Sequence, residues 1–190
     1  MSRAGLAAVA AVATLLGAGC GGGDDEAVRP DRVPAGSVAV VGESQITKAE
    51  LDRRVAALRR ATGKRSTPER RQLHSQALSV LLHEKAIEQE AAERGVTVDP
   101  REVRRRWNGV RRAQFANEKA VRRFLGGQTE QDVLRQLRLQ LLTEGIHDQI
   151  REQDGDTAVA RFQRDLQKRW TERTACRPRY ATVGCGERSG

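Results

Sequence analysis

The chain has 190 residues, enough for one ordinary domain or for one small domain with tails. Aromatic residues make up 3% of it and charged residues 31%, which favours a charged helical protein over a β-sandwich or barrel. The formal net charge is +9, and no apolar run reaches the length of about 18 residues that a spanning helix needs, which excludes a polytopic membrane protein.

The first twenty residues predict export from the cytoplasm. Arg3 supplies a positive charge, residues 4–16 are uncharged, and small residues then lead to Cys20. This order is typical of a secretory signal peptide. The small residues before Cys20 resemble a lipoprotein signal, in which Cys20 is the lipid attachment site, although Leu16 lies one place earlier than the usual Leu. Ordinary cleavage, with Cys20 incidental, is the alternative.

Residues 21–36 are rich in Gly, charge and Pro, and they predict a flexible tether ahead of a fold that begins near Ser37. Export also implies an oxidising compartment, where the remaining pair, Cys176 and Cys185, is expected to form a disulfide that closes the tail 175–190. Two free thiols are the alternative. A zinc site is not expected, because no His lies near this pair.

The folded part reads mainly as helices. The β-branched run 38–41 and the turn at Gly42 predict a short strand, and residues 179–183 predict a second one. Between them, N-cap residues, apolar stripes and terminal glycines predict six helices. Their expected ranges are 48–61, 68–94, 100–114, 118–125, 130–150 and 157–173.

The apolar stripes of these helices are narrow, so each helix can bury one edge but cannot fill a thick core. We therefore predict a mainly α, extended, cradle-like multi-helix domain over residues 37–174, with at most a small two-stranded β element.

No catalytic constellation is evident: the histidines lie apart, and neither a metal nor a cofactor is expected. The charge is more informative, because residues 101–123 hold nine basic residues against Glu102 and Glu118. An exported protein seldom meets nucleic acid, so anionic lipid or wall polymers are the plausible partners of this segment, and a solvated surface is the alternative. The candidate residues are Arg104, Arg105, Arg106, Arg111, Arg112, Arg122 and Arg123.

Three segments carry a resemblance to a known family. The run 38–52, with Gly42-Glu43 and Ile46-Thr47, resembles the opening "V-N-G-E-x-I-T" of the SurA/PrsA-type extracytoplasmic foldases. Residues 95–103 are similar to the family's "G-I-x-V-T-D-E-E-V", and residues 124–133 to its "L-x-x-x-G-x-T-x-E-D-L". The resemblance covers roughly residues 37–150. Full-length members add a parvulin-type prolyl isomerase domain, for which residues 151–156 leave no room.

The resemblance implies an extracytoplasmic chaperone of the SurA N-terminal-domain type that binds unfolded or nascent exported proteins without ATP, and the signal before Cys20 adds a lipid anchor. Trp107, Phe115 and Phe124 are the candidate client-binding residues, because aromatic residues this rare are costly to expose on a basic helix. Core packing of all three is the alternative. Two other functions stay open: a prolyl isomerase activity without a parvulin domain, and a structural envelope lipoprotein that binds anionic polymers or lipid.

Overall fold

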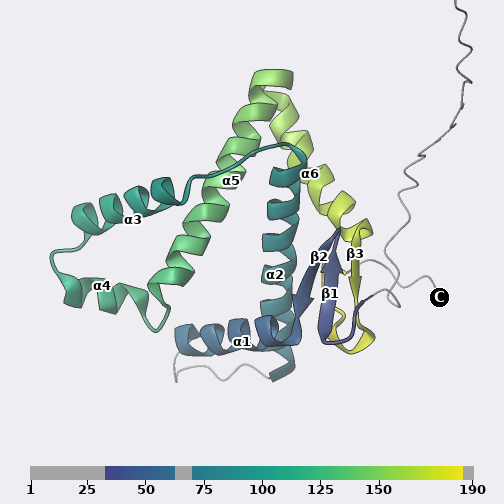
Figure 1. Ribbon diagram of the computed structural model, residues 1–190, viewed down its shortest axis with the longest axis horizontal. Helices are drawn as coiled ribbons and strands as arrows, with labels where there is room; N and C mark the ends of the chain where they lie inside the picture. Colours follow the sequence, from purple (N-terminus) through teal and green to yellow (C-terminus); the bar gives the residue numbers. More distant parts are fainter. Residues whose placement is uncertain (1–32, 63–69, 186–190) are drawn as a thin grey trace, which may run out of the picture.

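The computed structural model describes residues 33–62 and 70–185, in which six helices flank one small sheet (Figure 1). This confirms the mainly helical fold. The helices are α1 Lys48–Thr62, α2 Arg70–Glu93, α3 Pro100–Gln114, α4 Glu118–Leu125, α5 Glu130–Asp154 and α6 Asp156–Glu172. The strands are β1 Ser37–Val41, β2 Ser44–Thr47 and β3 Thr174–Cys176.

The sheet is antiparallel with the order β2-β1-β3, so it joins the two ends of the described chain. Gly42, at a φ of 53°, forms the turn between β1 and β2. The expectation of at most two strands is therefore wrong: the described part of the chain has three strands, and residues 178–180 form a 3₁₀ turn that begins at Pro178. The last strand lies earlier because residues 174–176 pair with distant β1, a contact that local sequence does not encode.

Helix ends follow the expected signals. Asp99 caps α3 and accepts a hydrogen bond from the Arg101 amide at 2.8 Å, and Asn117 caps α4 after the break between these helices. Thr129 and Asp132 form the reciprocal capping box of α5. The start expected for the second helix, at Thr67-Pro68, lies outside the described residues.

Helix α2 is the spine of the molecule, since buried residues pack on it from several sides. One cluster joins α2 to α1, the sheet and Trp170, and a second joins it to α5 and α6 (Figure 1). Between these clusters, the buried carboxylate of Glu90 accepts hydrogen bonds from Arg94 at 2.6 Å, from the Trp170 indole at 3.0 Å and from Arg169. These contacts fix α6 against α2.

Helices α3 and α4 form an arm that projects away from α2 and the sheet (Figure 1). Its own small core is made by Trp107 of α3, Val121 of α4 and Val133 of α5. The arm therefore rests on the first half of α5, separate from the clusters around α2. This layout agrees with the expected extended, cradle-like shape.

The N-terminal boundary lies earlier than expected. Val33 is buried with Val40 and Ala175, and the Arg177 guanidinium donates to the Pro34 carbonyl at 2.9 Å. The fold thus includes residues 33–36, which we had assigned to the tether. All four buried clusters lie between Val33 and Cys185, so a chain without residues 1–20 keeps every contact described here. None of the described helices is both long and apolar enough to span a bilayer.

Candidate functional site

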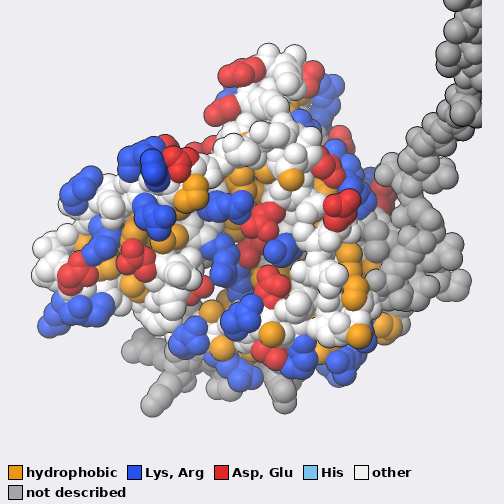
Figure 2. Space-filling view, viewed as in Figure 1, with side chains coloured by type: hydrophobic (Ala, Val, Ile, Leu, Met, Phe, Trp, Pro, Cys, Tyr) orange, Lys and Arg blue, Asp and Glu red, His pale blue; other side chains and the backbone are white. Residues whose placement is uncertain are grey.

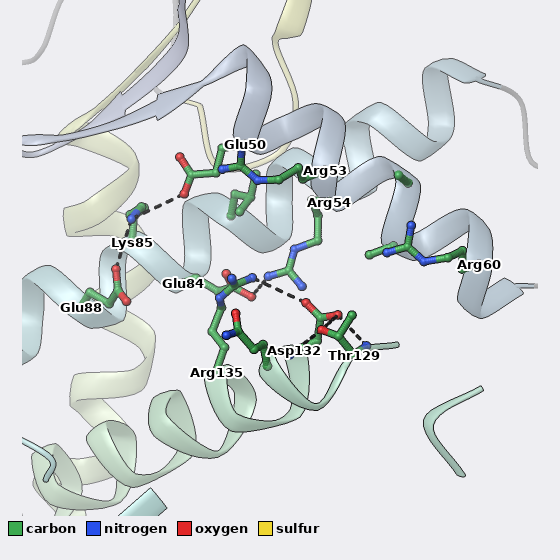
Figure 3. A pocket seen from close by; sticks show the side chains of 14 residues that line it. Glu50, Arg53, Arg54, Arg60, Glu84, Lys85, Glu88, Thr129, Asp132 and Arg135 are labelled. Carbon is green, nitrogen blue, oxygen red and sulfur yellow. Dashed lines mark hydrogen bonds and ion pairs between the residues drawn. The ribbon is translucent and has the colours of Figure 1, made fainter. Parts of the chain in front are cut away.

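A cleft of about 410 Å³ opens where α1 and α2 face the start of α5 (Figure 3). Arg60 lines one end of the cleft, and its Nε donates to the carbonyl of Gly127 at 3.0 Å. The side chains that line it are largely charged, and both signs are present. They include Glu50, Arg53, Arg54, Glu84, Lys85, Glu88, Asp132 and Arg135.

Ion pairs across the cleft tie its walls together. Arg54 of α1 pairs with Glu84 of α2, and each of these side chains is 11% exposed. Lys85 Nζ lies 3.3 Å from Glu88 Oε2 and 3.7 Å from Glu50 Oε1. Glu88 in turn accepts a hydrogen bond from Arg138 of α5 at 2.8 Å (Figure 3 shows the Lys85 and Arg54 pairs). The cleft is therefore a polar, preorganised surface.

The charges in the cleft are perturbed by burial and by their neighbours. Burial, followed by the nearby Arg135, lowers the pKa of the Arg54 guanidinium, whose Nε is buried without a hydrogen-bond partner among the described residues. Burial alone would raise the pKa of Asp132, but hydrogen bonds from the Thr129 hydroxyl and amide, with Arg135 and Arg54 nearby, hold that pKa below its ordinary value. The lowered pKa keeps the Asp132 carboxylate charged at neutral pH, and Arg54 stays charged because a guanidinium group is not deprotonated in proteins.

A second hollow of about 350 Å³ lies between α2, α3 and α5 and shares Glu88, Gln131 and Arg135 with the cleft. Val103 and Leu134 give this hollow an apolar floor, and Arg104 lies at its edge. Because the two hollows share lining residues, we treat them as one feature, the trough. The trough runs from α1 to the start of the arm.

The three candidate aromatic residues lie together in the arm. The ring centroids of Phe115 and Phe124 are 5.0 Å apart, and each lies 6.4 Å from that of Trp107. Trp107 is 2% exposed and forms the base of the cluster, which corrects the expectation that it faces a client. Phe124 is 57% exposed, and Phe115 is half-buried between them. Client contact by Phe115 and Phe124 stays a prediction.

The seven candidate arginines fall into two groups. Three have carboxylate partners: Arg105 pairs with Glu102, Arg106 lies 3.7 Å from Glu144, and Arg111 pairs with Glu118. The other four make no ion pair within 4.0 Å among the described residues. They are Arg104, Arg112, Arg122 and Arg123. Figure 2 shows Lys and Arg side chains gathered over the arm, with hydrophobic side chains visible between them.

The remaining candidates are placed as follows. Cys176 and Cys185 form a disulfide with a Cα–Cα distance of 5.7 Å, which confirms the expected pairing. Within residues 33–62 and 70–185, no group of three or more His, Cys, Asp or Glu side chains could hold a metal ion. Cys20 lies outside the described residues, so its role as a lipid attachment site stays a prediction.

Sequence reasoning missed the cleft. Its central pair, Arg54–Glu84, joins residues 30 positions apart, and both looked like ordinary surface charges. One signal was available: Glu84 lies among apolar residues on the buried stripe of the second helix, where an acidic side chain needs a partner.

Comparison with known protein families shows which family the chain is similar to. The family described as SurA-like N-terminal domain matches residues 4–147, which is more than half of the chain. Neither the curated proteins nor the solved structures contain a significant match.

Proposed function

The chain belongs to the SurA-like N-terminal domain family, a chaperone-type family, and we propose that it binds unfolded exported proteins and keeps them from aggregating. The family match over residues 4–147 is the observation that carries this proposal. Members of the family typically act outside the cytoplasm. The proposed binding is reversible and uses no ATP.

The trough and the arm support this proposal because they offer two complementary kinds of contact. The trough presents fixed charges of both signs, which can exchange hydrogen bonds with the backbone and the polar side chains of an unfolded chain. The arm presents the exposed ring of Phe124. A holdase needs many weak contacts of low selectivity, and an apolar side chain beside exposed charged groups supplies them.

We further propose that the protein is anchored to a membrane through a lipid on Cys20, with residues 21–32 as the spacer. The Cys176–Cys185 disulfide supports an exported location, since structural disulfides persist in oxidising compartments. A Cys20→Ser variant should lose incorporation of radiolabelled palmitate and move from the membrane fraction to the soluble fraction. Unchanged labelling would contradict the anchor.

The proposed function is tested by light scattering from a refolding client, with a chain of residues 21–190 added at near-equal stoichiometry and without ATP. We expect suppressed aggregation. Phe124→Ala should weaken it, whereas Val80→Ala, which truncates another exposed apolar side chain on α2, should not. No suppression across several unrelated clients would contradict the proposal.

A second candidate function, a structural role in the envelope through binding of anionic lipid or polymer, is favoured by the four arginines of the arm that make no ion pair within the described part of the chain. This role predicts tight binding to anionic vesicles that is lost steeply with added salt, and no effect on client aggregation. A proline-limited refolding assay separates both functions from a prolyl isomerase, because only an isomerase accelerates that step.

A further inference from the structure

The outer surface of the arm combines an exposed aromatic ring with arginines that have no carboxylate partner in residues 33–62 and 70–185. We define the arm surface as Phe115, Phe124, Arg112, Arg122 and Arg123. Arg122 and Arg123 directly precede Phe124 in α4, and all three side chains are exposed. Because its ring lies 5.0 Å from Phe115 and is supported from below by buried Trp107, Phe124 is held in place as a preformed apolar contact.

A concavity lies beside this ring, between α3 and α4. Its walls include Phe115, Val121 and Arg112, and the side-chain amides of Asn108 and Asn117. Arg111, on the same wall, is held by Glu118 and lies 3.8 Å from Glu130, whereas Arg112 has no ion pair among the described residues. The concavity can therefore take a side chain on its apolar wall while Arg112 faces an anion.

The net charge of the arm determines which sign of charge a partner must carry. Residues 100–125 contain nine Lys and Arg residues against two Glu residues, a net of +7. The trough, by contrast, is lined by seven basic and four acidic side chains, and several of them are paired with one another. A partner with carboxylates thus gains more attraction at the arm than at the trough, and a basic partner is repelled at the arm.

We propose that the arm surface binds acidic segments of unfolded clients, in which Asp or Glu residues flank an aromatic or large aliphatic residue. This rests on the proposed chaperone function and names its preferred substrate. The guanidinium groups pair with the carboxylates, and the apolar side chain packs on Phe124 and enters the concavity beside Phe115. We favour a polypeptide over a lipid surface as the partner. A flat anionic surface would use neither the concavity nor the side-chain amides in its walls, whereas these amides match the hydrogen-bonding groups of a peptide backbone.

The test uses residues 21–190 and three fluorescein-labelled 12-residue peptides, with fluorescence anisotropy as the readout. The first peptide carries two Phe residues flanked by Glu, the second replaces each Glu by Lys, and the third replaces each Phe by Ala. We expect the first to bind about tenfold more tightly than either of the others, and added salt to weaken its binding.

Variants assign the binding to the arm. The triple variant Arg112→Gln, Arg122→Gln, Arg123→Gln should weaken binding of the Glu–Phe peptide about tenfold, because three charge contacts are lost. The matched control replaces three exposed basic residues of α6, Arg161, Arg164 and Lys168, by Gln and should bind like the parent. A third triple variant, with Lys in place of the three arginines, should keep most of the affinity. Circular dichroism melting checks that all variants fold.

Equal affinity for the Glu and Lys peptides, or equal weakening by the arm and α6 variants, would overturn the proposal. Binding of phosphatidylglycerol vesicles that depends on the arm arginines, without peptide binding, would also overturn it and favour the membrane. The aggregation assay is independent of these outcomes: a protein that still suppresses aggregation without preferring acidic peptides refutes only this inference. A protein that does neither refutes the chaperone function as well.

Discussion

Replacement of Glu90 by Gln should weaken the packing of the last helix, α6, against α2. The Glu90 side chain is 2% exposed and accepts hydrogen bonds from Arg94, Arg169 and the Trp170 indole, so it joins α2 to α6. Glutamine keeps the shape but removes the charge, and its amide NH₂ then faces guanidinium groups. Two charge-assisted hydrogen bonds are lost as a result.

The magnitude follows from these contacts. A hydrogen bond to a charged group contributes about 1.5–3 kcal/mol, but Arg169 and Arg94 are partly exposed and regain water when Glu90 is neutral. We therefore expect a loss of about 2–3 kcal/mol in the free energy of unfolding. For a chain of this size that corresponds to a decrease in Tm of about 4–12 °C.

The matched control is Glu93→Gln, on the same helix. Glu93 pairs with Arg173 of α6 at 2.7 Å, but its side chain is 42% exposed, so the variant should lose less than about 1 kcal/mol. Thermal melting by circular dichroism gives both values, and hydrogen exchange should show faster opening of α6 in the Glu90 variant only. Equal Tm values for the two variants would refute the reasoning.

The pH dependence gives a second readout of the same contact. Burial alone would raise the pKa of Glu90, but hydrogen bonds from Arg94, Trp170 and Arg169 outweigh it and hold the pKa below its ordinary value of 4.5. The ionised carboxylate therefore stabilises the fold fully above about pH 4.5, and this contribution is lost as the pH falls through the lower, folded-state pKa. The stability difference between parent and Glu90→Gln should shrink in that range, and a difference that stays constant would contradict the assignment.

Three further predictions concern stability. Cys176→Ser should lose about 2.5–3 kcal/mol under oxidising conditions only, because the disulfide closes a short loop, and melting with and without dithiothreitol checks this. Denaturant unfolding should show that Gly42→Ala lowers the free energy of unfolding by about 2 kcal/mol and Gly36→Ala by about 1 kcal/mol. Both glycines have a positive φ, but only a Cβ at Gly42 would meet the Trp170 ring, at 3.1 Å. Equal losses for the two variants would contradict this argument. Chemical denaturation should show that Trp107→Ala lowers the free energy of unfolding by about 3–5 kcal/mol and Phe124→Ala by less than about 1 kcal/mol, because only Trp107 is buried. Similar losses would show that Phe124 belongs to the core.

Much of the fold could be predicted from local sequence signals. The caps at Asp99 and Thr129 act within one helical turn, so each predicted a helix start that the structure has. The sequence also predicts a capping box at Thr47 and Glu50, and the structure has half of it. The Thr47 hydroxyl accepts a hydrogen bond from the Glu50 amide at 3.1 Å, but the Glu50 carboxylate lies 3.7 Å from Lys85 Nζ.

What the sequence did not predict depends on distant contacts. Strand β2 was read as part of a turn because Ser44–Thr47 is short and polar, and β1 alone makes it a strand. The trough was missed for the same reason, since a charge such as Glu84 cannot be told from a surface charge until its partner Arg54 is placed. Trp107 was predicted to contact a client because aromatic residues are rare in this chain and Trp107 lies on a basic helix, whereas α4 folds over it and buries it.

The central claim is that unfolded chains bind along the trough and the arm, and photo-crosslinking tests it most directly. Benzoylphenylalanine would replace Gln131 in the trough or Phe124 on the arm, and the controls would carry it at Val80 of α2 or Arg161 of α6. With an unfolded client present, we predict adducts at positions 131 and 124 that excess unfolded client, but not native client, competes away. Adducts of equal yield at all four positions, or none at 131 and 124, would contradict the account.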